Sequence, residues 1–135
     1  MSATGIGTKD EGAIRKLIEN WANAVRNKDL DGILAHHSPD VLMFDVPPPL
    51  KSQGIDAYKK TWDLFFDWSP DKPVFEIREM NITAGYDVAF VTALMRCAGK
   101  TENQSGLEFR LTVGLRKIDD QWIVTHEHHS IPAEG

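Results

Sequence analysis

The sequence lacks several features that common classes of protein require. Its 135 residues include a single cysteine, Cys97, so no disulfide can form within the chain, and we expect this residue to pack as a small apolar side chain. There is no long apolar run, and the first residues lack the basic and apolar regions of a signal peptide. A cytoplasmic protein with no membrane contact is therefore expected.

Two classes of ligand are disfavoured for similar reasons. The net charge is -5, and the lysines and arginines are scattered instead of forming a stripe with aromatic residues, which argues against nucleic acid binding. Gly5, Gly7 and Gly12 precede the first expected helix with no strand before them, so they do not form a nucleotide-binding loop. We predict one domain, residues 1–135, with a flexible segment at 1–7 and no cofactor.

Hydrophobic periodicity predicts helices in the first part of the chain. Apolar residues recur at helical spacing over 14–25, and Thr8 with Glu11 forms a capping-box signal that places the helix start near residue 8. Asp29 is expected to cap a shorter second helix, which Pro39 ends because proline disfavours helical geometry in the preceding residue.

The remaining elements are one more helix and a set of strands. An apolar strand is predicted over 41–46, and a helix with an aromatic face follows from Gly54 to Ser69. Four further strands are predicted from period-two runs, at 74–83, 87–98, 107–118 and 121–131. This order indicates an α+β domain in which a curved, mainly antiparallel sheet wraps around three N-terminal helices.

The order of elements, the stretch NKDLDGILAHHSPDVLMFD and the ending DDQWIVTHEHHS resemble the NTF2-like superfamily, in particular its SnoaL-like and ketosteroid-isomerase-like branch. The ending is also similar to the association domain of calmodulin-dependent kinase II. The resemblance covers nearly the whole chain and implies a cone-shaped fold with an internal pocket. It implies less about activity, because one fold hosts many functions.

The resemblance assigns roles to single positions. Asp45 falls where ketosteroid isomerases place the aspartate that shuttles a proton, and Trp21 falls where they place a tyrosine; an indole N–H donates a hydrogen bond but is not an acid. Thr112 and Val113 lie near the place of their second, protonated aspartate, so that carboxylate has no counterpart. Arg110 matches an arginine that lines the cavity in kinase association domains.

Two interpretations of Asp45 stay open. One is a solvated carboxylate at a strand end, as most aspartates are. The other is a carboxylate in an apolar pocket between Phe44, Trp62 and Phe65, where desolvation would make it a usable base near neutral pH. An enolate formed by such a base would need a hydrogen-bond donor, which Arg110, Trp21 or a histidine could provide.

The stretch HEHHS, residues 126–130, contains three of the five histidines. Strict alternation along a strand puts His126 and His128 on one face, and Glu127 and His129 on the other. The family pattern suggests that His126 and His128 face the cavity.

Metal binding is an alternative for these histidines. Two imidazoles that project the same way can form half of a metal site, and His36 or His37 with Asp45 could complete a zinc or iron shell. His36 and His37 are also expected at the end of the second helix, where a positive imidazole is favourable. Because no second motif of defined spacing accompanies His126 and His128, polar pocket lining is preferred and no metal is expected.

These observations favour a small-molecule pocket that isomerises, dehydrates or cyclises a small apolar or aromatic carbonyl compound by proton transfer. The catalytic candidates are Asp45, His128 and Arg110. The substrate-binding candidates are Trp21, His37, Phe44, Trp62, Phe65, Thr112 and His126. The alternatives are a non-catalytic ligand-binding or association domain, and a metal-dependent hydrolase or lyase.

A homodimer is expected, mainly from the family resemblance. Leu111, Val113 and Leu115 are predicted on the outer face of the sheet and add support, because a partner would cover apolar area that is otherwise exposed.

Overall fold

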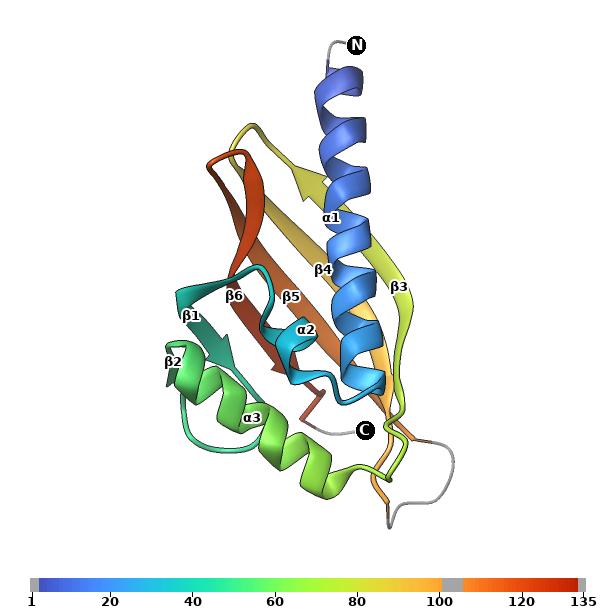
Figure 1. Cartoon of the computed structure of the whole chain (residues 1–135). Coiled ribbons are helices and arrows are strands. Elements are labelled where there is room, and N and C mark those ends of the chain that lie inside the picture. Colours follow the sequence, from blue (N-terminus) through green and yellow to red (C-terminus); the bar gives the residue numbers. More distant parts are fainter. Residues whose placement is uncertain (1–2, 101–105, 134–135) are drawn as a thin grey trace.

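The computed structural model describes residues 3–100 and 106–133, and within these ranges it has three helices and one six-stranded sheet (Figure 1). The helices are α1 (Ala3–Arg26), α2 (Leu30–Leu34) and α3 (Ile55–Trp68). The strands are β1 (His37–Phe44), β2 (Ser52–Gln53), β3 (Phe75–Ala84), β4 (Val88–Cys97), β5 (Leu107–Ile118) and β6 (Gln121–Ser130). None of the helices in the described ranges has the length and apolar character needed to cross a membrane.

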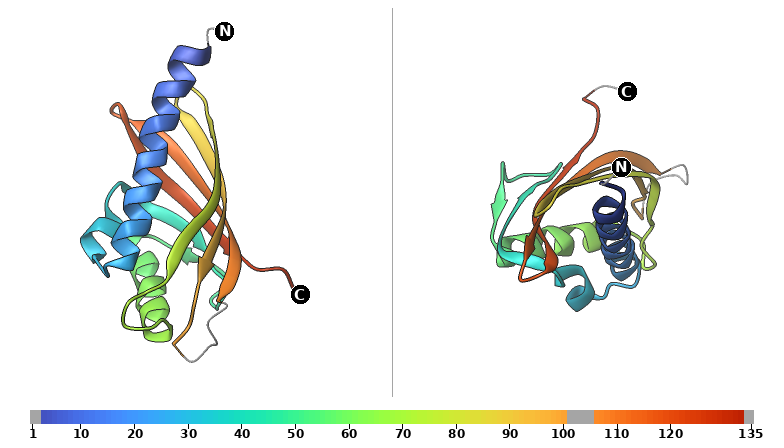
Figure 2. Two further views of the ribbon diagram at one scale, coloured as in Figure 1. Left: turned by 90° about the vertical axis from the view of Figure 1, so that its right-hand side faces the viewer. Right: turned by 90° about the horizontal axis from the view of Figure 1, so that it is seen from above.

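The sheet has the strand order β2-β1-β6-β5-β4-β3. Strands β3 to β6 form an antiparallel meander, and β1 lies parallel to β6. Seen from above, the sheet curves around α1, while α3 lies beside β1 and β2 and α2 lies against α1 (Figure 2). The predicted α+β fold with a curved, mainly antiparallel sheet is confirmed.

Local capping residues confirm two helix predictions and contradict a third. The Asp29 carboxylate accepts the Gly32 N–H at 3.2 Å and caps α2, and α3 begins directly after Gly54, whose φ is 93°. The helix α1 begins at Ala3, so the start predicted near Thr8 is wrong. A capping residue has to leave helical geometry, and Thr8 is within the helix. Met1 and Ser2, part of the segment expected to be flexible, lie outside the described residues.

The connection from α2 to β1 also differs from prediction. The helix ends at Leu34, because Ala35 leaves helical geometry with ψ of 142°, and His36 then adopts a left-handed conformation with φ of 59°. Its carbonyl accepts the Val124 N–H at 2.7 Å, which fixes this turn against β6. Strand β1 then begins at His37, earlier than predicted, so His36 and His37 do not lie on the last turn of a helix.

A bulge in β6 decides which side chains of that strand face the helices. Gly114 of β5 pairs with His126 and the next residue, Leu115, pairs with Val124, so Thr125 is an extra residue in β6. Before the bulge Val124 is buried, and after it Glu127 is buried, although an odd number of positions separates them. After the bulge, each residue of β6 therefore lies on the face opposite to the one that strict alternation predicts.

The outer face of the sheet has a different composition from the predicted one. Leu111, Val113 and Leu115 are buried beneath the helices, so their assignment to the outer face is wrong. The exposed apolar side chains of β4, which alternate with its buried positions, are Val88, Phe90 and Leu94. The homodimer stays a prediction.

Candidate functional site

A cavity of about 470 Å³ lies between α3 and the sheet, a volume typical of small-molecule pockets. Its walls are mainly apolar, and five aromatic side chains form much of them: Trp62, Phe65, Trp68, Phe75 and Phe109. The polar side chains that line it are Asp45, Thr61 and His129, together with the thiol of Cys97. A flat apolar molecule with few polar groups would suit such a cavity.

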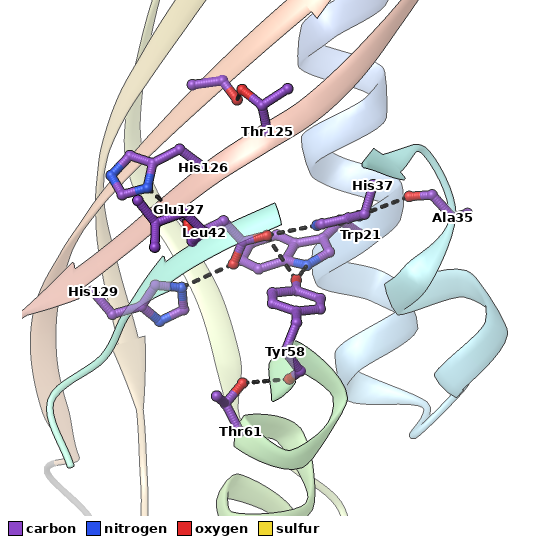
Figure 3. Close-up of polar contacts among 11 residues, drawn as sticks. Trp21, Ala35, His37, Leu42, Tyr58, Thr61, Thr125, His126, Glu127 and His129 are labelled. Atoms are coloured by element: carbon purple, nitrogen blue, oxygen red, sulfur yellow. Dashed lines mark hydrogen bonds and ion pairs between the residues drawn. The ribbon is translucent and has the colours of Figure 1, made fainter. Parts of the chain in front are cut away.

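Beside this cavity lies a buried carboxylate, Glu127 of β6, which is 1% exposed. One of its oxygens, Oε2, accepts hydrogen bonds from His37 Nε2 at 2.6 Å and from the Tyr58 hydroxyl at 2.7 Å. The other oxygen, Oε1, accepts from His129 Nε2 at 3.2 Å (Figure 3). Side chains from β1, α3 and β6 thus meet at one carboxylate.

These three donors keep Glu127 ionised. Burial alone would raise the pKa of this carboxyl, but hydrogen bonds from His129 and His37, and the electrostatic attraction of the same two side chains, lower the pKa to about 2. A buried carboxylate is costly unless it is paired and hydrogen-bonded, and here it is both.

The direction of the hydrogen bonds through Tyr58 follows from Trp21. An indole N–H can only donate, so the 3.0 Å contact between Trp21 Nε1 and the Tyr58 hydroxyl requires the tyrosine oxygen to accept. The tyrosine proton is then donated to Glu127. Burial and the neighbouring Glu127 charge raise the pKa of Tyr58 well above its usual range, so this residue stays a neutral phenol.

The imidazole of His129 connects this network to the cavity. Its Nε2 donates to Glu127, which leaves the lone pair of a neutral ring on Nδ1, the nitrogen that points away from Glu127 in Figure 3. The ring lines the cavity and stacks on Phe109, with centroids 5.5 Å apart. Glu127 therefore fixes the tautomer of an imidazole whose free nitrogen is directed away from the network.

Two further groups line the same cavity. Asp45 is partly buried, and its Oδ1 accepts the N–H of Val46 at 2.8 Å. Burial raises the pKa of Cys97 to about 11; the Arg96 charge opposes this increase and the Asp45 charge adds to it. The thiol is therefore protonated near neutral pH, as expected for a small packing residue.

Comparison with known proteins agrees with this architecture. The sequence matches the family model of the SnoaL-like domain over residues 14–134. A solved NTF2-like protein of unknown function from Pseudomonas putida KT2440 is 36% identical, with a TM-score of 0.85 over 93% of this chain and 88% of that one. The chain belongs to the SnoaL-like family of NTF2-like proteins.

More distant structures show the fold alone. A candidate dehydratase of the NTF2-like family from Streptomyces avermitilis is 15% identical, with a TM-score of 0.77 over 94% of this chain and 99% of that one. A candidate ketosteroid isomerase from Shewanella frigidimarina is 16% identical, with a TM-score of 0.70 over 85% and 92% of the two chains. No curated protein matches the sequence.

Three of the predicted pocket residues of this SnoaL-like domain do line the cavity: Asp45, Trp62 and Phe65. Phe44 does not, because neighbouring residues of a strand point to opposite faces and Met43, the preceding residue of β1, faces the cavity. The Phe44 ring instead contacts His126 and His128, with centroids 5.1 and 5.3 Å away.

The predicted inward orientation of His126 and His128 is wrong, because the bulge at Thr125 turns both histidines to the outer face. His128 is exposed, and His126 Nδ1 bonds the Leu42 carbonyl at 2.7 Å. Glu127 and His129 take the inward positions instead.

Four other predicted residues lie away from the cavity wall. Arg110 and Thr112 are exposed on the outer face of β5, where Arg110 Nε donates to Ser130 Oγ at 3.1 Å. Trp21 and His37 are buried in the Glu127 network and do not line the cavity. Arg110 and Thr112 share one face of β5, as predicted, but that face is the outer one.

The alternative metal site, formed by His126 and His128 with Asp45 and His36 or His37, is not present. His126 and His128 face outward while Asp45 faces the cavity, so they cannot share one ion. In the part of the chain that the structure describes, no cluster of three or more histidine, cysteine, aspartate or glutamate side chains has a geometry suited to a metal.

Proposed function

We propose that this SnoaL-like domain binds a small, largely apolar carbonyl compound and moves a proton on it, in an isomerisation, dehydration or cyclisation. His129 and Asp45 are the groups that exchange protons with the substrate. The observation that carries the proposal is an imidazole that lines an apolar cavity and is held by a buried, ionised carboxylate, Glu127.

The arrangement suits general base catalysis. His129 accepts a proton at Nδ1 from a carbon next to a carbonyl, and the nearby Glu127 stabilises the imidazolium that forms. Asp45 lines the same cavity and exchanges a proton at a second position of the substrate. A positioned base of this kind contributes roughly 10²–10⁴-fold to a rate.

The charge of the cavity indicates a neutral substrate. Its described lining contains no lysine or arginine, while Asp45 supplies a negative charge. A carboxylate or phosphate on the substrate would therefore be desolvated without a cationic partner, which is costly. A ketone or aldehyde with an apolar body avoids that cost.

Calorimetric titration with a series of phenols from pH 5 to 9 tests this proposal, because phenols and phenolates resemble enols and enolates. His129→Gln is expected to weaken the binding of neutral phenols about tenfold, since the acceptor at Nδ1 is lost. Asp45→Asn is expected to tighten the binding of a phenolate several-fold, since a repelling charge is removed. His128→Gln, on the same strand but facing outward, is the matched control and leaves both affinities unchanged.

The outcomes separate the proposal from its main alternative. Phenol binding that responds to neither His129→Gln nor Asp45→Asn would indicate a non-catalytic ligand-binding domain. If no phenol binds at any pH, the small-molecule pocket itself is contradicted. If phenols bind as predicted, turnover of β,γ-unsaturated ketones can be followed by absorbance, and His129→Gln should lower kcat by roughly 10²–10⁴-fold.

A further inference from the structure

His37 is a buried histidine held between two hydrogen-bond acceptors. Its Nδ1 lies 2.9 Å from the carbonyl oxygen of Ala35, and its Nε2 lies 2.6 Å from Glu127 Oε2. Only 1% of its side chain is exposed, so water does not replace either partner. A carbonyl oxygen only accepts and an ionised carboxylate only accepts, so both ring nitrogens have to carry a proton. A ring protonated at both nitrogens is a cation.

The other contacts of Glu127 agree with this direction. Tyr58 has to donate to Oε2 because its oxygen already accepts from Trp21. His129 contacts the other oxygen, Oε1. With donors at both oxygens, the carboxylate has no need of a proton of its own, and the two charges in contact are those of His37 and Glu127.

The pairing of His37 with Glu127 determines the net charge beside His129. If Glu127 were paired with His129 alone, the negative carboxylate would favour the cationic form of the imidazole, as opposite charges within a few ångströms do. A cationic ring has no lone pair with which to accept a proton. The positive charge of His37 already neutralises Glu127. The carboxylate therefore still accepts the Nε2 proton of His129 but does not strongly favour the cationic form of that ring.

Other titratable groups face the cavity beside His129 as well. They are Asp45, which carries a negative charge, and Cys97, which is protonated near neutral pH. Among the residues that the structure describes, the hydrogen bond of the His129 side chain is with Glu127 and not with either of these groups. The charge balance at Glu127 is therefore the nearest influence on the ring.

We infer that His37 is a positioning residue that carries a positive charge paired with Glu127, and that it thereby keeps His129 an uncharged base facing the cavity. The catalytic significance of this arrangement rests on the proposed function. The charge of His37 does not, because it follows from hydrogen bonds within the protein.

NMR of the histidine ring nitrogens in the ligand-free protein tests this inference directly. At pH 7 both nitrogens of His37 are expected to resonate as protonated, and His129 as a neutral ring with its proton on Nε2. A His37 ring with one proton at pH 7 would overturn the inference. This spectrum needs no variant, so it decides the question even if a substitution at His37 prevents folding.

His37→Gln supplies the second test, because glutamine keeps an N–H donor for Glu127 and removes the charge. The titration midpoint of His129 is expected to move to higher pH by about one unit, since an uncompensated carboxylate favours the imidazolium. His36→Asn is the matched control: asparagine tolerates the left-handed backbone at this exposed position, and the midpoint should not move.

The results also separate this inference from the proposed function. An unchanged His129 midpoint in folded His37→Gln protein would overturn the role of His37. The predicted nitrogen spectra together with a failure to bind any phenol would contradict the proposed function and leave the charge arrangement intact.

Discussion

Glu127→Gln is expected to lower the free energy of unfolding by about 3–5 kcal/mol, the usual cost of breaking a buried ion pair by removing one partner. Glutamine has nearly the same volume, so no large cavity forms. The loss comes from His37, whose side chain is 1% exposed and would no longer have a carboxylate to pair with at Nε2. Urea unfolding followed by tryptophan fluorescence at pH 7 measures the change.

Two companion variants make this result specific. Glu108→Gln removes a carboxylate that is 76% exposed and lies 3.7 Å from Arg78, so its effect should stay below about 1 kcal/mol. Combining Glu127→Gln with His37→Gln removes both buried charges and should recover part of the lost stability. A loss below about 1 kcal/mol in the single Glu127 variant would contradict the buried charge pair.

Acid is expected to remove a similar contribution from the wild-type protein. The pKa of Glu127 is lowered from the ordinary 4.5 to about 2 in the folded state. A lowered pKa contributes stability that is complete above pH 4.5 and is lost as the pH falls through about 2. At about 1.4 kcal/mol per pH unit, this difference corresponds to roughly 3 kcal/mol.

Comparing wild type with Glu127→Gln at each pH isolates this carboxylate from the other acidic residues. The difference in unfolding free energy between the two proteins should be largest above pH 5 and should shrink steadily toward pH 2. Parallel stability curves over that range would show that Glu127 does not titrate with a lowered pKa.

Much of the fold could be predicted because long elements carry strong periodic signals. The runs predicted for β5 and β6 begin at Leu107 and Gln121, as the strands do. The aromatic face of α3 correctly placed Trp62 and Phe65 in the wall of a cavity. The family resemblance located Asp45, which directly follows β1 and faces the cavity, as does Met43 two residues earlier.

The faces of β5 and β6 could not be predicted in the same way. Alternation shows which residues of a strand share a face, but not which of the two faces is covered by the helices. In β5 the covered face carries Leu111, whereas the prediction assigned it to the face that carries Arg110. In β6 the single extra residue Thr125 places Glu127 on the inner face, where strict alternation predicts His126. A one-residue bulge changes the period-two pattern of the sequence too little to be detected.

The Glu127 network was missed for a further reason. Its partners His37 and Tyr58 lie 90 and 69 residues away in the chain, so no local spacing reveals them. A glutamate in a strand is ordinarily taken as exposed, because this residue type is almost never fully buried unless it is paired. Only the packing of β1 and α3 against β6 shows that this one is paired.

The central claim is that His129 presents an unprotonated nitrogen to a ligand in the cavity. The most direct measurement is NMR of the histidine ring nitrogens as the protein is saturated with a phenol that binds it. We predict that the Nδ1 resonance of His129 shifts as it accepts a hydrogen bond while its Nε2 proton is retained. A bound phenol that leaves His129 unchanged, or that shifts His126 and His128 instead, would contradict the account.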